Sequence, residues 1–282
     1  MPLSGLVGGW RRIMCGALLS AVLSPVSSFA QNPPQLVDLK LLLAVDVSGS
    51  IDFWESDLQR DGYVKALKDE TVINTILSGQ TGRIALSYVE WAGGDHQRVV
   101  VDWSLIDSHE AAYAVAEDLN VRPHMAGRRT SIGNMLKFAT DWFRDPRFFA
   151  ERQVIDISGD GPNNTGAKVD EARDLAIANG ITINALPILN ERPSPYGFPK
   201  LVDLDVYYEE CVIGGSGAFV IVAKGIRSFA AAVRRKMILE VAGLTPERPV
   251  LAVPVQMGGS AKPYECDIGE QQLHEFLNRS DD

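Results

Sequence analysis

The sequence predicts a doubly wound α/β fold, with a mostly parallel six-stranded sheet, one antiparallel edge strand and helices on both faces. Three observations predict it. Short apolar runs alternate with stretches of helical periodicity, which is the pattern of a parallel sheet with helical crossovers. Two of the runs are separated only by a short turn, so those two strands must be antiparallel. The first run, 41–45, is unbroken, as in a strand buried on both faces.

Apolar residues gather into six short runs, and strands are expected at 41–45, 83–91, 97–103, 154–157, 181–189 and 218–222. Residues at helical spacing separate them, and helices are expected at about 53–77, 108–119, 132–143, 168–179, 203–211 and 226–241, with a weaker one at 271–277. The first helix should break near Asp69. Ser108 should cap the start of the second, and Gly180 should end the fourth.

The first thirty residues are typical of a secretory signal peptide. Arg11 and Arg12 precede the apolar stretch 13–26, and Ser28-Phe29-Ala30 puts small residues at a cleavage site. We therefore expect export, to the periplasm or the exterior, with cleavage after Ala30; the alternative is an uncleaved N-terminal anchor. No later stretch is long enough to span a membrane, so no span is expected after cleavage.

The expected organisation is a signal peptide (1–30), a linker (31–38), one α/β domain (39–242) and an irregular C-terminal extension (243–282). The chain has 27 basic and 36 acidic residues, a net charge of −9. Because both charges of the leader are basic, the mature protein is more acidic still. An acidic balance argues against nucleic acid and anionic membranes as partners.

Side-chain oxygens follow two of the expected strands and one loop. Asp46, Ser48 and Ser50 end the first strand, Thr130 precedes a helix, and Asp160 ends the fourth strand. In a doubly wound sheet the first and fourth strands lie side by side at the switch point, where ligands bind. Hydroxyl and carboxylate oxygens are hard donors, suited to a small divalent cation.

At these positions the chain resembles the von Willebrand factor A (VWA) family, whose fold is the Rossmann-like integrin I domain. That family's metal-ion-dependent adhesion site (MIDAS) uses Asp-x-Ser-x-Ser, a distant Thr and a later Asp-Gly, and all five positions are matched here. The resemblance covers about 39–241. The segment from Tyr207 to Gly215 is also similar to exported bacterial VWA-like proteins with no assigned activity.

The resemblance implies that Ser48, Ser50 and Thr130 ligate Mg²⁺ (magnesium), or Mn²⁺, while Asp46 and Asp160 act largely through bound waters. It further implies a partner protein that presents Asp or Glu to the metal. No catalytic residue is expected. The bland alternative is that the Asp46 loop only turns the chain and caps the next helix, and that Thr130 is only an N-cap.

Two departures from the family pattern stand out. Arg128-Arg129 precede Thr130 where the family often has Gly, and we expect them to be mainly solvated charges. Ser158-Gly159-Asp160 replaces the usual Thr-Asp, which leaves the placement of Asp160 less defined.

Two other functions compete with metal-bridged binding. A haloacid-dehalogenase-like phosphatase would also use Asp46 beside Mg²⁺, but it needs a second Asp where this chain has Ser48. No Gly-x-Ser-x-Gly motif of a serine hydrolase is present. The other alternative to metal-bridged binding is a structural domain with an empty site.

Two further features bear on the mature chain. Cys15 leaves with the leader, so Cys211 and Cys266 either pair as a disulfide or stay separate as buried thiols. The loop 192–199 leaves the same rim as the candidate site. Its Tyr196 and Phe198 either contribute to recognition or pack on the domain's own surface.

Overall fold

The computed structural model describes Met1 and residues 33–123, 125–189, 198–246 and 264–279. The chain divides into two compact units, Met1–Pro33 and Pro34–Asp282, and every helix and strand described below belongs to the second. The expected signal peptide and its cleavage site after Ala30 lie outside the described residues and stay predictions. Within the described residues, no helix is both long enough and apolar enough to cross a bilayer.

The central sheet has five strands in the order β4-β3-β2-β6-β7. Their bounds are β2 Leu39–Asp46, β3 Ile84–Trp91, β4 Gln97–Ile106, β6 Gln153–Gly159 and β7 Ile181–Pro187. β2 pairs in parallel with both β3 and β6, and only β4 runs antiparallel, against β3. The expected hairpin and the adjacency of the first and fourth predicted strands are therefore confirmed.

The expected six-stranded sheet is wrong in its last strand. This segment forms only isolated parallel bridges, from Val220 to Ala185 of β7 and from Ala223 to Ile188 just after β7. Backbone hydrogen bonds link Ala185 to Phe219 and Ile221 on one side of Pro187, and Leu189 to Ala223 on the other. Because proline has no N–H, Pro187 cannot donate the bond that would continue a ladder between them. The remaining pairing is a separate two-stranded sheet of β1 (Gln35–Leu36) and β5 (Phe148–Phe149).

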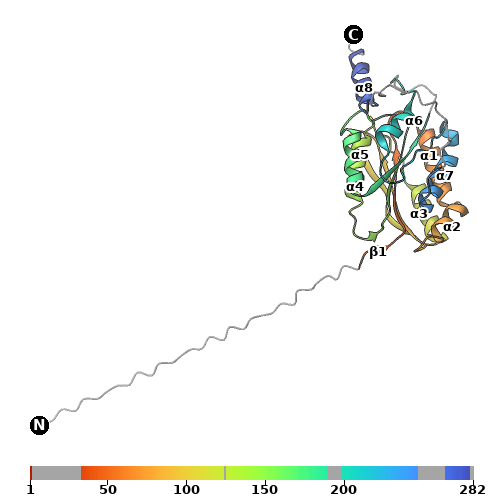
Figure 1. The fold of residues 1–282 in the computed structure, drawn as a ribbon, viewed down its shortest axis with the longest axis vertical. Coiled ribbons are helices and arrows are strands. Elements are labelled where there is room, and N and C mark those ends of the chain that lie inside the picture. The colour runs from red at the N-terminus through yellow and green to blue at the C-terminus, as the bar shows by residue number, and fades with distance from the viewer. Residues whose placement is uncertain (2–32, 124, 190–197, 247–263, 280–282) are drawn as a thin grey trace, which may run out of the picture. The chain divides into compact units, whose positions relative to one another are not determined.

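Helices cover both faces of the central sheet (Figure 1). One face carries α1 (Phe53–Leu67), α2 (Glu70–Leu77), α3 (His109–Val121) and α7 (Phe229–Ala242), and the other carries α4 (Ile132–Trp142) and α5 (Val169–Ala178). Strand β2 is buried along its whole length, with alternate residues entering two cores. Leu41 and Leu43 pack on the α1 side, and Leu42 packs on the α4 side.

The expected helix boundaries hold where a capping residue marks them. Asp69 separates α1 from α2, and its carboxylate accepts hydrogen bonds from the backbone N–H groups of Thr71 and Val72. The Ser108 hydroxyl caps α3. Gly180 follows α5 with a φ of +78°, a conformation that glycine adopts without strain.

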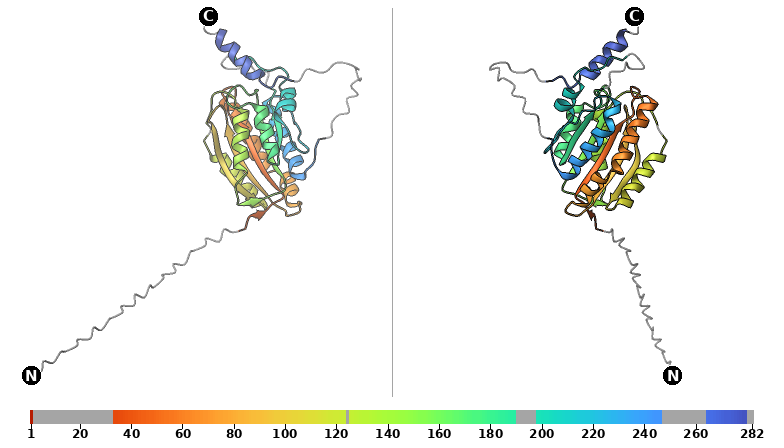
Figure 2. Two further views of the ribbon diagram at one scale, coloured as in Figure 1. Left: turned by 60° about the vertical axis from the view of Figure 1, so that its left-hand side comes forward. Right: turned by 90° about the vertical axis from the view of Figure 1, so that its right-hand side faces the viewer.

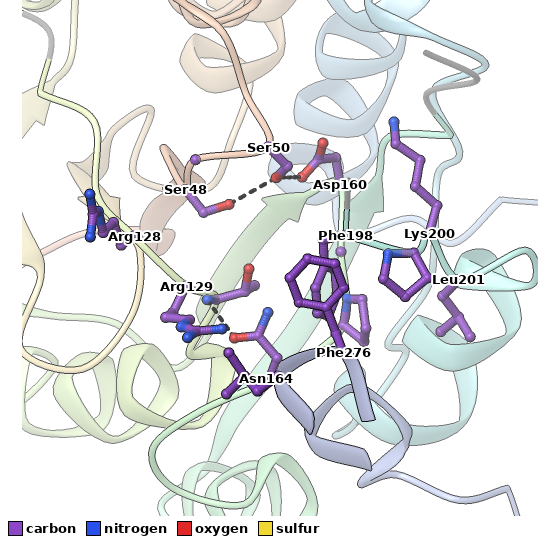
Figure 3. Close-up of a pocket in the computed structure, with 16 residues that line it drawn as sticks. Ser48, Ser50, Arg128, Arg129, Asp160, Asn164, Phe198, Lys200, Leu201 and Phe276 are labelled. Carbon is purple, nitrogen blue, oxygen red and sulfur yellow. Dashed lines mark hydrogen bonds between the residues drawn. The ribbon is translucent and has the colours of Figure 1, made fainter. Parts of the chain in front are cut away.

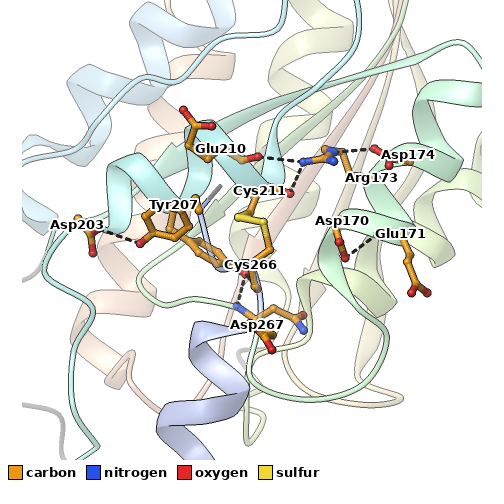
Figure 4. Close-up of a disulfide and its surroundings, with 12 residues drawn as sticks. Asp170, Glu171, Arg173, Asp174, Asp203, Tyr207, Glu210, Cys211, Cys266 and Asp267 are labelled. Carbon is orange, nitrogen blue, oxygen red and sulfur yellow. Dashed lines mark hydrogen bonds and ion pairs between the residues drawn. A yellow bond between two sulfur atoms is a disulfide. The ribbon is translucent and has the colours of Figure 1, made fainter. Parts of the chain in front are cut away.

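The chain beyond β7 is built from short turns and two longer helices. Helix α6 (Leu204–Tyr207) continues into a π-helical turn, Tyr208–Val212, and a 3₁₀ turn, Ile226–Ser228, leads into α7. Helix α8 (Ile268–Arg279) is longer than the expected 271–277, and it lies beyond the edge of the sheet where β2 and β6 end (Figure 2). The disulfide between Cys211 and Cys266 joins its N-terminal side to the π-helical turn, so the separate-thiol alternative is wrong (Figure 4).

Candidate metal-binding site

The end of β2 delivers a buried carboxylate to a tight loop. Asp46 Oδ1 accepts a hydrogen bond from the backbone N–H of Ser48 at 2.7 Å. This contact turns the chain so that the hydroxyl oxygens of Ser48 and Ser50 lie 3.1 Å apart. The Ser50 hydroxyl then donates to Asp160 Oδ1 at 2.5 Å, which connects the loop after β2 to the loop after β6 (Figure 3).

Neither serine hydroxyl caps the next helix. Asp52 does so, because its carboxylate accepts the backbone N–H of Glu55 at 2.8 Å, and the Glu55 side chain accepts the N–H of Asp52 in return. The capping alternative is thus wrong for Ser48 and Ser50, whose hydroxyls serve the contact between loops instead.

Thr130 is likewise not a helix cap. The Ser131 hydroxyl caps α4. The backbone of Thr130 is held on both sides by Asn164, whose side-chain oxygen accepts the Thr130 N–H and whose own N–H donates to the Thr130 carbonyl, each at 2.9 Å. A backbone hydrogen bond from Gly127 to Val47 ties the same loop to the one after β2. Three separate loops are therefore fastened to one another by hydrogen bonds.

These loops surround a cavity of about 360 Å³. Ser48, Ser50, Thr130 and Asp160 all line it, whereas Asp46 lies buried beside it. Its other lining residues are Gly49, Arg128, Arg129, Gly161, Pro162, Asn164, Phe198, Pro199, Lys200, Leu201, Phe276 and Leu277. The five expected residues are thus brought to one place in the structure.

Each of the two carboxylates of the site has one oxygen without a hydrogen bond from the described residues. Oδ2 of Asp46 and Oδ2 of Asp160 are each buried, and neither has a hydrogen-bond partner among the described residues. Burial, and then the charge of Asp160, raises the pKa of Asp46 to about 8. Burial also raises the pKa of Asp160. A cation beside both groups would favour their ionised forms, so the residues present fit a bound metal.

Within the described residues, no group of three or more His, Cys, Asp or Glu side chains is arranged to hold a metal ion. A cation in this cavity would therefore depend on neutral hydroxyl donors and water. Such a donor set suits Mg²⁺, which prefers oxygen ligands and usually keeps several waters.

The structure explains the departure from the VWA pattern at Gly159. Gly159 stands where the family usually has Thr, and a Cβ there would lie 2.6 Å from the Tyr208 hydroxyl and 2.9 Å from Asp46 Oδ2. Tyr208 is fully buried, and its hydroxyl donates to the Gly161 carbonyl at 3.3 Å. Tyr208 thus supports the site from the π-helical turn, a role that no spacing in the sequence indicates.

The departure at Arg128-Arg129 includes an arginine with a strained backbone. Arg129 has a φ of +65°, and it is the only described non-glycine residue with a positive φ. Its neighbour across the loop is Gly93, where a Cβ would lie 2.6 Å from the Arg129 Cβ. Both Arg128 and Arg129 are exposed, as expected for solvated charges. The glycine usual in the family would adopt this backbone conformation without strain.

The loop 192–199 is only partly described. Tyr196 lies outside the described residues. Phe198 lines the cavity and packs edge-on against Phe276 of α8, with ring centroids 5.6 Å apart. Phe198 therefore packs on its own chain and also faces the candidate site, and its part in recognition stays a prediction.

Solved structures share this fold. Proximal thread matrix protein 1 from the mussel byssus, in a form with a zinc-occupied MIDAS motif, matches with a TM-score of 0.55 and 15% identity over 75% of this chain and 50% of that one. The pilus adhesin SpaC from Lactobacillus rhamnosus GG matches with a TM-score of 0.53 and 12% identity over 76% of this chain and 32% of that one. The chain thus spans half or less of these proteins, and the likeness shows a VWA-type fold alone.

In sequence, no curated protein matches the chain. A family model does match, over residues 36–245, which include the whole central sheet and all five candidate site residues. The chain therefore belongs to the family described as protein of unknown function DUF1194.

Proposed function

We propose that this protein is an exported, metal-dependent protein-binding domain. Ser48, Ser50 and Thr130 would hold Mg²⁺, or Mn²⁺, and Asp46 and Asp160 would contribute through bound water. The metal would supply a coordination position for a carboxylate from Asp or Glu of a partner protein. One observation carries the proposal: Asp46 and Asp160 each have a buried carboxylate oxygen with no hydrogen-bond partner among the described residues, beside hydroxyls from separate loops that are fastened together.

The choice of donors explains why such a site would bind rather than catalyse. Hydroxyl ligands are neutral, so they leave most of the positive charge of the cation uncompensated. Carboxylates that act through water orient the ligands without neutralising the metal. An anionic oxygen from outside is then the natural additional ligand.

The phosphatase alternative is less well supported. A nucleophilic Asp46 would have to reach substrate, yet its side chain is fully buried and does not line the cavity. The position two residues later, where that chemistry needs a second carboxylate, holds Ser48.

Export to the periplasm or exterior is part of the proposal. The N-terminal pattern of a signal peptide supports it, and so does the disulfide, because disulfides persist mainly in oxidising compartments. Two proteins with the same fold, a byssus matrix protein and a pilus adhesin, agree with an adhesive role outside the cell.

Metal binding is tested first, on the full mature chain. Titration of Mg²⁺ into chelator-treated protein should raise the melting temperature, and Ser48→Ala/Ser50→Ala should abolish that shift. Ser104→Ala, which removes an exposed hydroxyl of β4, is the matched control and should keep it. An unchanged melting curve at millimolar Mg²⁺ and Mn²⁺ would instead support the empty-site alternative. Metal-dependent phosphatase turnover that Asp46→Asn abolishes would support the enzyme.

Partner binding is tested second. Wild-type protein immobilised with Mg²⁺ should retain a partner from native extract, and both chelator and Ser48→Ala/Ser50→Ala should release it. Retention that ignores chelator would place recognition elsewhere on the surface.

A further inference from the structure

One wall of the candidate site comes from outside the region that the family model matches. Phe276 and Leu277 of α8 line the cavity together with Phe198 and Leu201, whereas the matched region ends at residue 245. The Phe198 and Phe276 rings meet edge-on at an interplanar angle of 68° (Figure 3). An apolar wall therefore stands opposite the hydroxyls and carboxylate of the metal-binding loops.

Helix α8 is held in this position by several contacts. The disulfide anchors its N-terminal side to the π-helical turn (Figure 4). The Glu270 side chain accepts a hydrogen bond from Asn163 Nδ2 at 2.6 Å. Gly269 lies so close to the Asn163 backbone that a Cβ on it would be 2.0 Å from the Asn163 carbonyl oxygen. The wall is therefore part of the folded domain.

The same contacts connect α8 to the metal-binding loops. Asn163 Oδ1 accepts the backbone N–H of Gly133 at the start of α4, and its neighbour Asn164 holds Thr130. One short segment thus supports the Thr130 loop on one side and α8 on the other. The distance between the hydroxyl donors and the apolar wall is set by this shared support.

The charges of the cavity favour an acidic ligand. Arg128, Arg129 and Lys200 line it, and Asp160 is the only acidic residue among its lining residues that the structure describes. A volume of about 360 Å³ exceeds the needs of a single carboxylate and falls in the range of pockets that enclose a larger group. A ligand that fills the cavity must therefore present an acid and an apolar group together.

Two residues close in sequence to lining residues of the cavity are apolar and exposed. Phe53, three residues after Ser50, is 74% exposed, and Val202, next to Leu201, is 95% exposed. Exposed apolar residues around a polar site are typical of protein–protein contacts. The surroundings thus favour a polypeptide over a free small molecule.

We propose that the site recognises a partner polypeptide segment in which an acidic residue has a large apolar neighbour, and that Phe276 of α8 and Phe198 form the specificity wall for that neighbour. This inference rests on the proposed metal-dependent function. It adds that the C-terminal helix is part of the binding site.

Two blocked peptides test the proposal in Mg²⁺ by isothermal titration: acetyl-Gly-Phe-Asp-Phe-Gly-amide and acetyl-Gly-Ala-Asp-Ala-Gly-amide. Burial of one large apolar side chain predicts that the Phe peptide binds at least about tenfold more tightly. Phe276→Ala should reduce this preference to about twofold or less while leaving the affinity for the Ala peptide unchanged. Phe198→Ala should act in the same direction, and Phe149→Ala, at an exposed position on β5, should have no effect.

The contrary results separate the two proposals. Equal, Mg²⁺-dependent binding of both peptides would overturn the specificity wall and leave the metal-dependent function standing. Absence of binding by either peptide, in protein that Mg²⁺ stabilises, would overturn the wall and the acidic ligand together. A preference for the Phe peptide that persists in chelator would overturn the joint recognition proposed here. Equally tight binding of 3-phenylpropionate would identify a small carboxylate as the ligand instead of a polypeptide.

Discussion

The hydroxyl of Tyr208 occupies the space into which a side chain on Gly159 would extend. A Cβ at Gly159 would lie 2.6 Å from this oxygen, closer than atoms pack in proteins. Strand β6 and the π-helical turn therefore approach each other directly behind Asp46. The absence of a side chain at residue 159 and the presence of a tyrosine at residue 208 are two halves of one packing arrangement.

Gly159→Ala should consequently destabilise the protein by about 1–3 kcal/mol, the usual cost of overpacking. Gly161→Ala is the matched control, because a Cβ there would make only one contact within 4 Å, at 3.9 Å from Thr130 Oγ1. Urea denaturation in chelator measures both. Tyr208→Phe, which removes the hydroxyl, should reduce the cost of Gly159→Ala in a double-mutant cycle; strictly additive effects would contradict the steric explanation.

Arg129 should be a site where glycine is tolerated better than alanine. Its φ of +65° strains any residue with a Cβ, at a cost of about 1 kcal/mol. Arg129→Gly should therefore be more stable than Arg129→Ala by about that amount in urea denaturation. At Arg128, whose φ is not positive, the order should reverse, because glycine adds entropy to the unfolded chain. If alanine is more stable than glycine at both positions, the strain proposed at Arg129 is contradicted.

A buried cluster of charges should be costly to break. Lys236 is fully buried and pairs with Asp156 at 2.5 Å and with Glu240 at 2.6 Å. Lys236→Met should destabilise the protein by about 3–5 kcal/mol, because it leaves the buried carboxylate of Asp156 without its counter-charge. Lys65→Met breaks the exposed pair with Asp61 and should cost less than about 1 kcal/mol. The unfolding free energies of both variants measure these costs. Comparable losses of stability would contradict the prediction that the buried charge cluster is the more costly to break.

The same cluster should make stability depend on pH. Burial, followed by the charge of Asp156, raises the pKa of Glu240 from 4.5 to about 8. The folded state then holds this proton more tightly than the unfolded state. The contribution of Glu240 to stability is full below pH 4.5 and is lost as pH rises toward 8, by at most about 1 kcal/mol per pH unit.

Glu240→Gln isolates this effect, since glutamine keeps hydrogen-bonding capacity toward Lys236 and Asn184 and has no proton to lose. The variant should gain stability relative to wild type between pH 5 and pH 8. Urea unfolding of both proteins in chelator measures the difference, and the contribution of Asp46, whose pKa is also raised, cancels between them. Stability curves that run parallel across this range would refute the assignment.

The disulfide should matter for ligand selection as well as for stability. Its two cysteines are separated by 55 residues, and removal of such a bridge typically costs about 2–4 kcal/mol. Cys266→Ser should therefore lower the melting temperature. It should also weaken the preference for the Phe peptide while Mg²⁺ binding is kept, because Phe276 belongs to α8 and the hydroxyl donors do not. If Cys266→Ser instead loses Mg²⁺ binding and keeps the preference for the Phe peptide, this prediction is contradicted.

Much of the fold was predictable because its signals are local. The unbroken apolar run of β2, the turn between β3 and β4, and the caps at Asp69 and Ser108 each depend on residues a few positions apart. The prediction that residues 218–222 form a sixth strand was wrong, and the residue that explains this is visible in the sequence. Pro187 lacks the N–H that a ladder would require, but this matters only once the segment that contains Phe219 and Ala223 is known to lie beside β7.

Part of the candidate site was also predictable from the sequence. The proximity of the Asp46 loop and Asp160 was predictable because the ends of adjacent parallel strands meet at one edge of the sheet. Thr130 precedes a helix, and its place beside them was expected from the resemblance to the VWA family.

The amino-acid sequence by itself determined the α/β class, the central position of the first strand and the set of oxygens gathered at its end. Only the tertiary structure decided that Tyr208 fills the space beside Gly159, that Asn163 supports both the Thr130 loop and α8, and that Phe276 stands in the wall of the cavity. The physical reason is the separation along the chain of the residues that interact. Periodicity and capping act within a few residues, whereas these contacts join segments that are far apart along the chain and meet only when the whole domain packs.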